Sequence, residues 1–273
     1  MACYACARVL EIAPTTIPRM AIVSLEVLSA MAFALTDGAR RYGLQGILVF
    51  AGLCVLVGNV IENIGVATGI PFGRYYFVDL MGPKLFHVPM LLGLAYIGMA
   101  YVSWTLASTI LNCGPEQRQS SRIFAVPFLA GFIMASWDLA QDPVWATVLH
   151  GWVWIDGGPW FGVPISNYVG WYGTVLLIYL FFASYLFRYF SRQPGRNRSS
   201  ARPALLFYLL CAAGNILQSI PHSAGTVAQD PTGRQWMVAD ITRASALVSI
   251  FVMGSFVAIA WIRMARATNT ITD

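Results

Sequence analysis

The sequence predicts an all-α protein that crosses a membrane about seven times. Hydrophobic residues make up 58% of the 273 residues and charged residues only 11%, and the mean hydropathy is +0.64. This balance is typical of polytopic membrane proteins rather than of soluble domains. A lipid-exposed backbone must satisfy its own hydrogen bonds, so each crossing segment is expected to be a helix.

Seven apolar runs follow one another along the chain, and a hydrocarbon core of roughly 30 Å needs about 20 residues for each crossing. They cover residues 17–35, 44–62, 86–111, 123–140, 166–190, 204–221 and 241–265. Because the runs use most of the chain and show no internal repeat, residues 1–273 are expected to form a single integral-membrane domain without strands. The N-terminus lacks the basic start, apolar core and small-residue cleavage site of a removed signal peptide.

The first two spans each carry a carboxylate. Glu26 lies near the middle of the first span, where a buried structural role and a role in a site are equally good interpretations. The second span ends after Glu62 in a stretch of glycines and aromatic residues. Asn59 and Asn63 flank Glu62 within helical reach, so we expect them to offer hydrogen bonds to an inward-facing carboxylate.

The fourth span ends in two aspartates. Asp138 and Asp142 are four residues apart, so a continuing helix stacks them on one face, and Pro143 is expected to end that helix at about Asp142. Two like carboxylates in an apolar setting tend to share a proton, which allows one of them to serve as an acid. The alternative is that Asp142 only caps a turn. Asp240 precedes the seventh span and is expected to be its N-cap.

The net charge of +5 is explained by topology. Eleven of the 17 basic residues fall on one side of the seven spans, namely Arg40, Arg41, Arg118, Arg122, five arginines between 188 and 202, Arg263 and Arg266. The positive-inside rule makes that side cytoplasmic, which places the N-terminus outside a cell (inner) membrane and the C-terminus inside. Binding of anionic lipid headgroups is the alternative role. On the other side, Asp79 and Asp230 sit in polar loops and are expected to be solvated.

Residues 137–171 contain six tryptophans between two apolar spans. An aromatic belt at the membrane interface is one explanation for such residues. Their density, and their interleaving with Gly-Gly and Gly-Val-Pro, instead favours the lining of a shaped apolar pocket. Such a pocket suits a long hydrophobic substrate, and each ring face stabilises a desolvated cation by ~0.5 to 2 kcal/mol.

Three motifs in fixed order resemble a known family. They are ENIGVATGIPFGRYYF at 62–77, Asp138 followed by Gln-Asp-Pro at 141–143, and GWVWIDGGPWFGVPISNYVGWY at 151–172. Over about residues 20–265 the chain resembles the carotenoid biosynthesis family of integral membrane proteins. That family includes the carotenoid 1,2-hydratases, known as γ-carotene 1'-hydroxylase and bisanhydrobacterioruberin hydratase.

The resemblance implies an enzyme that adds water, without cofactor or metal, to the terminal double bond of an acyclic (ψ) carotenoid end group. Protonation leaves a tertiary cation, which water then captures. We expect Asp138, with Glu62 as the alternative, to donate the proton, and Asp142 or the other carboxylate to orient the water and accept its proton. Asn167 is expected to position the carboxylates.

Two sets of residues complete the predicted site. Those expected to bind substrate are Trp137, Trp145, Trp152, Trp154, Tyr75, Phe72, Phe161, Asn167 and Trp171. Weaker candidates are Glu26, Asp156, His150 and Asn63. The expected partners are membrane lipid and a carotenoid, whether lycopene, γ-carotene or a C50 precursor, and no nucleic acid. The sequence leaves open whether the protein works as a homodimer and whether one or both ends of the substrate react.

Several other classes lack their defining residues. The single lysine, Lys84, lies at the mouth of a span, which argues against a retinal Schiff base. His87, His150 and His222 are too far apart in sequence for a di-iron cluster. Paired D-D-x-x-D motifs are missing, and Cys3 and Cys6 form one C-x-x-C without a second pair, so neither a zinc site nor a disulfide framework is supported. Two alternatives stay open: a lycopene cyclase, which starts with the same protonation, and a carotenoid-binding or transport protein, against which the lack of a repeat argues.

Overall fold

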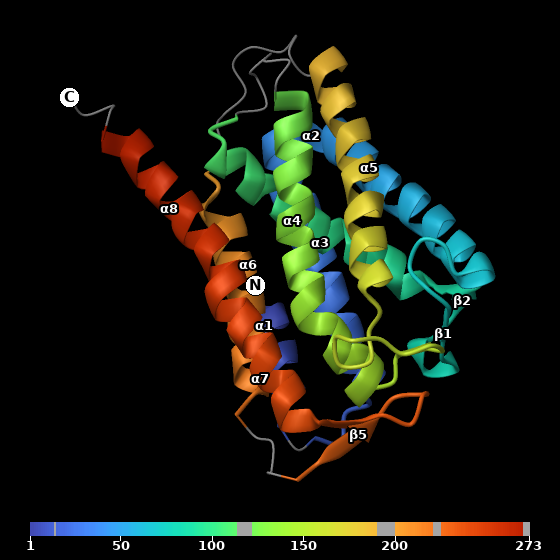
Figure 1. Cartoon of the computed structure of the whole chain (residues 1–273). Helices are drawn as coiled ribbons and strands as arrows, with labels where there is room; N and C mark the ends of the chain where they lie inside the picture. The colour runs from blue at the N-terminus through green and yellow to red at the C-terminus, as the bar shows by residue number, and fades with distance from the viewer. Residues whose placement is uncertain (14, 114–121, 190–199, 221–224, 270–273) are drawn as a thin grey trace.

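The computed structural model describes residues 1–13, 15–113, 122–189, 200–220 and 225–269, and most of them form helices that pack side by side (Figure 1). The helices are α1 (Ala2–Leu10), α2 (Arg19–Thr68), α3 (Met90–Ile110), α4 (Arg122–Pro143), α5 (Ile165–Tyr189), α6 (Arg202–Gln218), α7 (Val238–Val248) and α8 (Gly254–Asn269). The π-helical turns are η2 (Val144–Val148), which extends α4, and η4 (Ser249–Met253), which joins α7 to α8. The predicted all-α polytopic membrane fold is confirmed.

Six candidate membrane segments result when α2 is divided at its break. Five helices of the described residues are long and apolar enough to cross a membrane. One of them, the 50-residue α2, breaks at Gly43, where φ is 72° and ψ is 169°. Its halves, 19–42 and 44–68, fold back on each other, since a Cβ on Gly38 would lie 2.3 Å from the Ile47 side chain. Nine residues of unbroken helix would separate these positions by about 13.5 Å.

With both halves of α2 and the 17-residue α6 counted, the segments correspond to the seven predicted runs. The boundaries differ in places. Residues 36–42, expected in a connection, are helical, and α3 starts at Met90 rather than at residue 86 because residues 84–89 belong to a hairpin. The basic residues Arg118, Arg192, Arg196 and Arg198, together with His222, lie outside the described residues.

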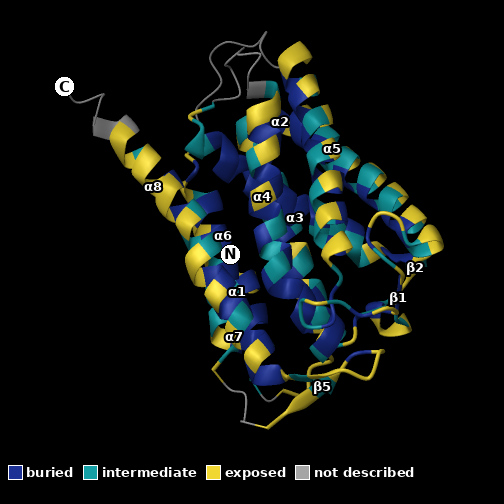
Figure 2. Cartoon of the chain, in the orientation of Figure 1, coloured by how far each residue is buried: buried dark blue, intermediate teal, exposed yellow. Residues whose placement is uncertain are grey.

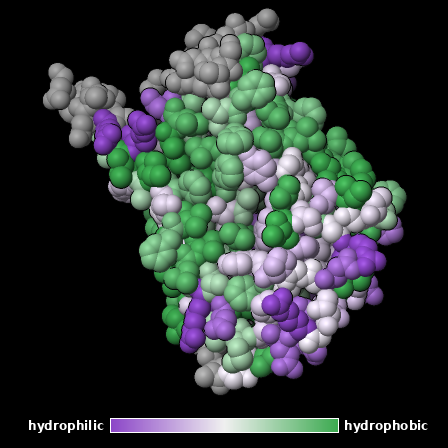
Figure 3. Space-filling model, in the orientation of Figure 1, coloured by the Kyte–Doolittle hydropathy of each residue, from purple (hydrophilic) through white to green (hydrophobic). Residues whose placement is uncertain are grey.

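The outward faces of the helices carry apolar side chains. On the second half of α2, Leu44, Leu48, Leu56, Val60 and Ile64 are all exposed, at spacings of four or eight residues. Figure 2 shows that buried residues face the interior of the bundle while exposed residues face outward. In Figure 3, hydrophobic side chains cover the middle of the molecule, and hydrophilic ones gather toward its two ends. This distribution suits a surface in contact with lipid.

Three antiparallel hairpin-like pairs of strands lie in the connections at one end of the bundle, the lower end in Figure 1. They are β1 (Tyr75–Phe77) with β4 (Trp152–Trp154), β2 (Lys84–Leu85) with β3 (Val88–Pro89), and β5 (Val227–Gln229) with β6 (Gln235–Met237), and the short 3₁₀ helix η1 (Asp79–Met81) lies between β1 and β2. The expectation of a chain without strands is wrong. Hydropathy identifies only the crossing segments, whereas the longer connections pair with each other.

A short N-terminal helix, α1, was also not predicted. It packs against α2 and α6 rather than extending away from the bundle. Tyr4 and Arg8 of this helix are among the most deeply buried side chains of the molecule. The segment therefore contributes to the protein interior, although it is too short to cross a membrane.

Three expectations about aspartates and helix ends are corrected by the structure. Pro143 does not end the helical path, because η2 carries it on to Val148. Asp240 is not the N-cap of α7, since that position is Met237 and Asp240 lies in the first helical turn. Asp230 is not solvated but buried, at 5% exposure.

The burial of Asp230 is offset by neutral donors from its own hairpin. The hydroxyl of Thr232 donates to Asp230 Oδ1 at 2.6 Å, and Trp236 Nε1 donates to Oδ2 at 3.0 Å. Burial by itself raises the pKa of Asp230, but these hydrogen bonds outweigh burial and lower the pKa below its usual value. The exposed Asp79 is solvated as expected and pairs with Lys84 at 2.9 Å.

Candidate active site

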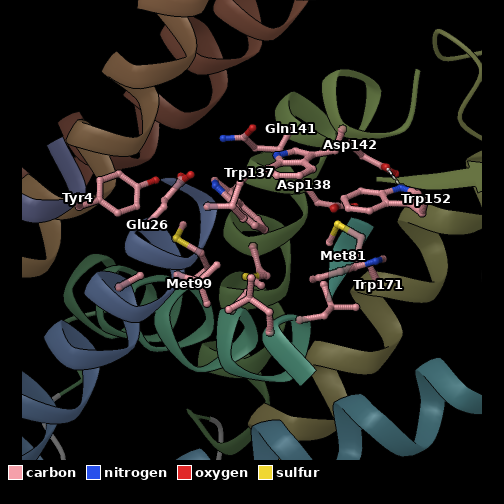
Figure 4. A pocket seen from close by; sticks show the side chains of 18 residues that line it. Tyr4, Glu26, Met81, Met99, Trp137, Asp138, Gln141, Asp142, Trp152 and Trp171 are labelled. Carbon is pink, nitrogen blue, oxygen red and sulfur yellow. Dashed lines mark hydrogen bonds between the residues drawn. The ribbon is translucent and has the colours of Figure 1, made fainter. Parts of the chain in front are cut away.

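An apolar cavity of about 90 Å³ lies within the bundle, and Figure 4 shows the side chains around it. Four of the predicted tryptophans contribute to its wall, Trp137, Trp145, Trp152 and Trp171. Trp145 and Trp152 stack with ring centroids 5.9 Å apart. Methionine and aliphatic side chains from α2, α3 and α4 form most of the remaining wall.

The polar groups of the cavity gather at two ends. Asp138 and Asp142 lie at one end beside Trp152, whereas Tyr4 and Glu26 lie at the other end, with Trp137 between the two groups (Figure 4). The sequence predicted the first end as the reaction site and left Glu26 as a weaker candidate. The structure brings both ends to the wall of one cavity.

Asp138 and Asp142 are bridged by an amide. The Nδ2 of Asn167, near the start of α5, donates to Asp138 Oδ2 at 3.4 Å and also donates to Asp142. Trp152 Nε1 donates to Asp142 Oδ1 at 2.7 Å. The two aspartates are buried, at 4% and 2% exposure. Within the described part of the chain, neither forms an ion pair, so neutral donors alone hold this pair.

Glu62 is held by two tyrosines. The hydroxyl of Tyr75 donates to Oε2 at 2.5 Å, and the hydroxyl of Tyr96 donates to Oε1 at 2.7 Å. Burial, together with the adjacent Glu62 carboxylate, raises the pKa of Tyr75, so its hydroxyl stays a proton donor at neutral pH. Tyr75 comes from β1 and Tyr96 from α3, so two different elements hold the carboxyl group.

The expected amide bonds to Glu62 are not formed. Asn59 Nδ2 donates to the carbonyl of Val55, and Asn63 Nδ2 donates to the carbonyl of Asn59. Asn63 Oδ1 accepts the backbone N–H of His87 instead. That prediction is wrong, because both amides bond to the preceding helical turn, a local arrangement that competes with contacts between side chains.

A second, smaller chamber of about 20 Å³ separates Glu62 from Asp142. The residues around it are Glu62, Tyr75, Phe77, Leu92, Asp142, Trp152, Trp154, Asn167 and Trp171. Four residues line both spaces, namely Leu92, Asp142, Trp152 and Trp171. The large cavity therefore contacts Asp138 and Asp142, whereas the small chamber contacts Asp142 and Glu62.

At the opposite end of the large cavity, Arg8 organises a cluster of polar side chains. Its Nη1 lies 2.7 Å from Glu11 Oε2 and 3.2 Å from Glu26 Oε1, and its Nη2 donates to Asn215 Oδ1 at 2.8 Å. Gln141 Nε2 donates to the same Asn215 oxygen at 2.8 Å. Burial, followed by repulsion from Glu26, raises the pKa of Glu11 to about 8. One cation therefore faces two carboxyl groups at this end, and Glu11 keeps its proton up to about pH 8.

Two of the predicted substrate-binding residues, Phe72 and Phe161, line neither the large cavity nor the small chamber. Phe72 packs between Gly65 and Gly170, where an added Cβ would come within 2.5 Å and 2.6 Å of its ring. Phe161 packs against Trp236 at a centroid distance of 5.5 Å. Their contacts are those of packing residues in the wall behind the site.

The weaker candidates differ in whether they line a cavity. Asp156 is exposed and accepts hydrogen bonds from the guanidinium of Arg74, which lowers the pKa of Asp156. His150 is exposed, with a positive φ of 52°. Neither residue reaches the cavities, and Asn63 is occupied by backbone contacts. Of this group, only Glu26 contributes to a cavity wall.

Sequence reasoning missed Tyr96, Tyr4 and Arg8. No signal distinguished Tyr96 from other aromatic residues of its span. For the N-terminal segment a signal existed, since Tyr4, Arg8 and Glu11 follow the spacing of one helical face. Within the described residues, no group of three or more His, Cys, Asp or Glu side chains is placed to hold a metal ion.

A comparison with protein families identifies the family of the chain. The chain matches the family described as carotenoid biosynthesis protein over residues 20–228, which is more than half of its 273 residues. The matched part includes Glu26, Glu62, Asp138, Asp142 and the aromatic walls, whereas α1 precedes it. No curated protein and no solved structure matches the chain. On the extent of the family match, the chain belongs to the carotenoid biosynthesis protein family.

Proposed function

We propose that this chain is a carotenoid 1,2-hydratase, which adds water to the terminal double bond of an acyclic (ψ) carotenoid end group. The observation that carries the proposal is the pair of buried carboxyl groups, Asp138 and Asp142, bridged by Asn167 at the wall of an apolar, indole-lined cavity. Membership of a carotenoid biosynthesis family supplies the substrate class. The reaction needs no cofactor.

The surroundings of the aspartates support an acid–base role. Two carboxyl groups in one apolar site that face neutral donors rather than a cation favour holding one proton between them. Asp138 contacts the large cavity but not the small chamber, so it is the better placed donor toward an alkene in the large cavity. Glu62 is the alternative donor.

The steps of the reaction balance without any proton from the solvent. The O–H bond of the Asp138 carboxyl breaks as its proton bonds to C2 of the alkene, and the π electrons leave a tertiary cation at C1. A water oxygen bonds to C1, and the proton it loses passes to Asp142. The aspartate pair then holds one proton again, and the substrate has gained one water to give a tertiary alcohol.

The indole rings around the cavity suit the intermediate. Trp137, Trp145 and Trp152 line the space next to Asp138. A desolvated cation over an aromatic face is stabilised by about 0.5 to 2 kcal/mol for each ring. Aliphatic and methionine side chains complete the wall and exclude bulk water, so the cation has few partners other than the double bond of the substrate and a held water.

The first experiment is expression in a bacterial host that accumulates lycopene, with the extracted pigments separated and weighed by mass spectrometry. A more polar pigment that is heavier by one or two waters supports the hydratase. A pigment of unchanged mass with a shifted spectrum identifies a cyclase instead. Unchanged lycopene, followed by unchanged γ-carotene and C50 precursors in matching hosts, contradicts the enzymatic proposal and favours a carotenoid-binding or transport role.

We also propose the orientation that the charges predicted, with the N-terminus outside a cell (inner) membrane and the C-terminus in the cytoplasm. The basic side chains Arg263 and Arg266 near the end of α8 support it. A reporter that works only in the cytoplasm should be active when it is fused after Asp273. Activity of a periplasmic reporter at the same position would reverse the orientation.

A further inference from the structure

The small chamber has the size and the polar groups of a site for one water molecule. A buried site of about 10 to 15 Å³ holds one water when two to four polar groups surround it. The chamber measures about 20 Å³, and carboxyl groups of Glu62 and Asp142 lie on its wall with the hydroxyl of Tyr75. It is therefore large enough for one water and too small for a carotenoid end group.

Trp154 supplies an independent sign that the chamber takes a ligand. Its side chain lines the chamber and is buried, at 4% exposure. Its Nε1–H forms no hydrogen bond of normal geometry with the described residues, although it interacts with the Asp142 carboxyl group. A buried donor without a partner is rare and costs about 1 to 3 kcal/mol. A water in the chamber accepts this hydrogen bond and donates to the carboxylates.

The pairing of β1 with β4 holds the Trp154 side chain in place relative to the Glu62 carboxyl group. In the β1–β4 pair, Trp154 lies directly opposite Tyr75, and their rings pack with centroids 4.7 Å apart. Tyr75 in turn donates to Glu62. The β1–β4 pair therefore fixes Trp154 and Glu62 relative to each other through a single intervening residue, Tyr75.

The boundary between the two spaces consists of side chains that belong to both. Trp152 and Trp171 line the large cavity and the small chamber, and each is held by a further contact. Trp152 donates to Asp142 at 2.7 Å, and Trp171 stacks on Tyr96 at a centroid distance of 4.5 Å and an angle of 3°. A cation formed in the large cavity and a water in the chamber thus meet at this boundary.

We propose that the chamber positions the attacking water, with Trp154 Nε1–H as the donor that holds its oxygen and the carboxylates of Glu62 and Asp142 as the acceptors of its protons. This inference rests on the proposed hydratase function. It also names the feature that separates hydration from cyclisation, since a cation without a held water is left to the neighbouring double bond or to loss of a proton.

The test uses Trp154→Phe, which keeps an aromatic ring and removes the N–H. Membranes containing the full-length protein are incubated with lycopene in D2O, and pigments are analysed for added water and for deuterium in recovered lycopene. Protonation by the deuterated carboxyl forms a C2–D bond, and loss of a C2 proton to the carboxylate regenerates the alkene with deuterium in it. Deuterium uptake therefore reports protonation even when water does not add.

We expect Trp154→Phe to lower water addition at least tenfold while deuterium uptake in recovered lycopene, or the yield of cyclised pigment, stays level or rises. Trp236→Phe, which removes an indole N–H that bonds Asp230 and lines neither cavity, is the matched control and should keep the wild-type ratio. Water addition at the wild-type rate in Trp154→Phe overturns the inference. A parallel loss of hydration and deuterium uptake in folded protein also overturns it.

A failure of the underlying function gives a different pattern. If the wild-type protein neither hydrates lycopene nor exchanges deuterium into it, the proposed function is wrong for this substrate and the water site loses its basis. If the wild-type protein exchanges deuterium but forms only cyclised pigment, the acid assignment stands and the water assignment falls. Glu62→Gln provides a second variant, which should reproduce the split seen with Trp154→Phe.

Discussion

The two ends of the large cavity hold carboxyl groups in opposite electrostatic surroundings. At one end, Asp138 and Asp142 meet the neutral donors Asn167 and Trp152. At the other end, Glu26 and Glu11 both lie within 3.2 Å of the guanidinium of Arg8. The residue types and the depth of burial are similar, but among the described residues only the Glu26 end contains a cation.

This difference separates a chemical role from a structural one. A cation stabilises the ionised carboxylate, and a buried ion pair is costly to break once formed. Carboxyl groups that face only neutral donors can bind and release a proton more readily. We therefore assign the proton transfer to the aspartate end and the attachment of α1 to the Arg8 end.

The largest expected effect is on catalysis at the aspartate end. Asp138→Asn should lower the rate of water addition by about 10² to 10⁴, because general acid catalysis contributes factors of that size. Glu26→Gln should lower it far less. The measurement is hydrated product formed per amount of protein in membranes. Asp79→Asn, which alters an exposed carboxylate outside both cavities, is the control that should keep the wild-type rate.

Two variants can contradict the assignment of Asp138 as the acid. If Asp138→Asn and Glu62→Gln both keep full activity in well-expressed protein, neither carboxylate is the donor. A loss in Glu62→Gln alone, in both water addition and deuterium uptake, would transfer the acid role to Glu62.

The second effect is on stability at the other end. Arg8→Met leaves Glu11 and Glu26 without their cation, and removing one partner of a buried pair costs about 3 to 5 kcal/mol. Thermal unfolding of the purified protein in detergent, followed by circular dichroism, should show a lower midpoint. Arg74→Met removes an exposed guanidinium that pairs with Asp156 and should leave the midpoint unchanged. Equal midpoints for Arg8→Met and the wild type would refute a structural role for this cluster.

A smaller effect is expected from the amide that bridges the aspartates. Asn167→Leu removes the shared donor at similar volume, and hydrogen bonds to charged groups contribute about 1.5 to 3 kcal/mol, which corresponds to a rate loss of roughly 10- to 100-fold. The pH profile of the remaining activity should shift as well, which a purely structural defect would not cause. Asn63→Leu, at an amide outside both cavities, should change the rate by much less and leave the profile in place.

The last effect concerns the pH dependence of stability. The pKa of Glu11 is raised from 4.5 to about 8, so the folded protein binds more protons than the unfolded chain between these values. Stability should therefore be highest below about pH 4.5 for this group and fall as the pH rises toward 8, by at most about 1.4 kcal/mol per pH unit for one proton. Glu11→Gln should flatten this decline in detergent unfolding midpoints. An unchanged slope would exclude Glu11 as its source.

Much of the candidate site was predictable because it depends on local sequence. The spacing of Asp138 and Asp142 on one helix predicts a shared face, and the density of tryptophans between 137 and 171 predicts an aromatic wall. The donors to Glu62 were predicted from its helical neighbours and came instead from Tyr75 and Tyr96. Asn59 and Asn63 are close to Glu62 in sequence. Their side-chain amides nevertheless bond to backbone carbonyls of the preceding helical turn rather than to the Glu62 carboxyl group.

The sequence by itself determined which segments enter the membrane. Transfer of about 20 apolar residues into a hydrocarbon core depends on composition and length, and lipid does not distinguish one apolar face from another. For that reason the seven segments were found from hydropathy alone, even though the break at Gly43 lies within one 50-residue helix.

Only the tertiary structure decided which carboxylate receives which partner. Arg8 meets Asn215 across 207 positions, and Asn167 meets Asp142 across 25. Such contacts depend on the rotation and pairing of helices, which small packing differences and buried hydrogen bonds set once the segments are inserted. The same physical step divides the interior into a large cavity at Asp138 and a small chamber between Glu62 and Asp142, and hydropathy carries no information about that division.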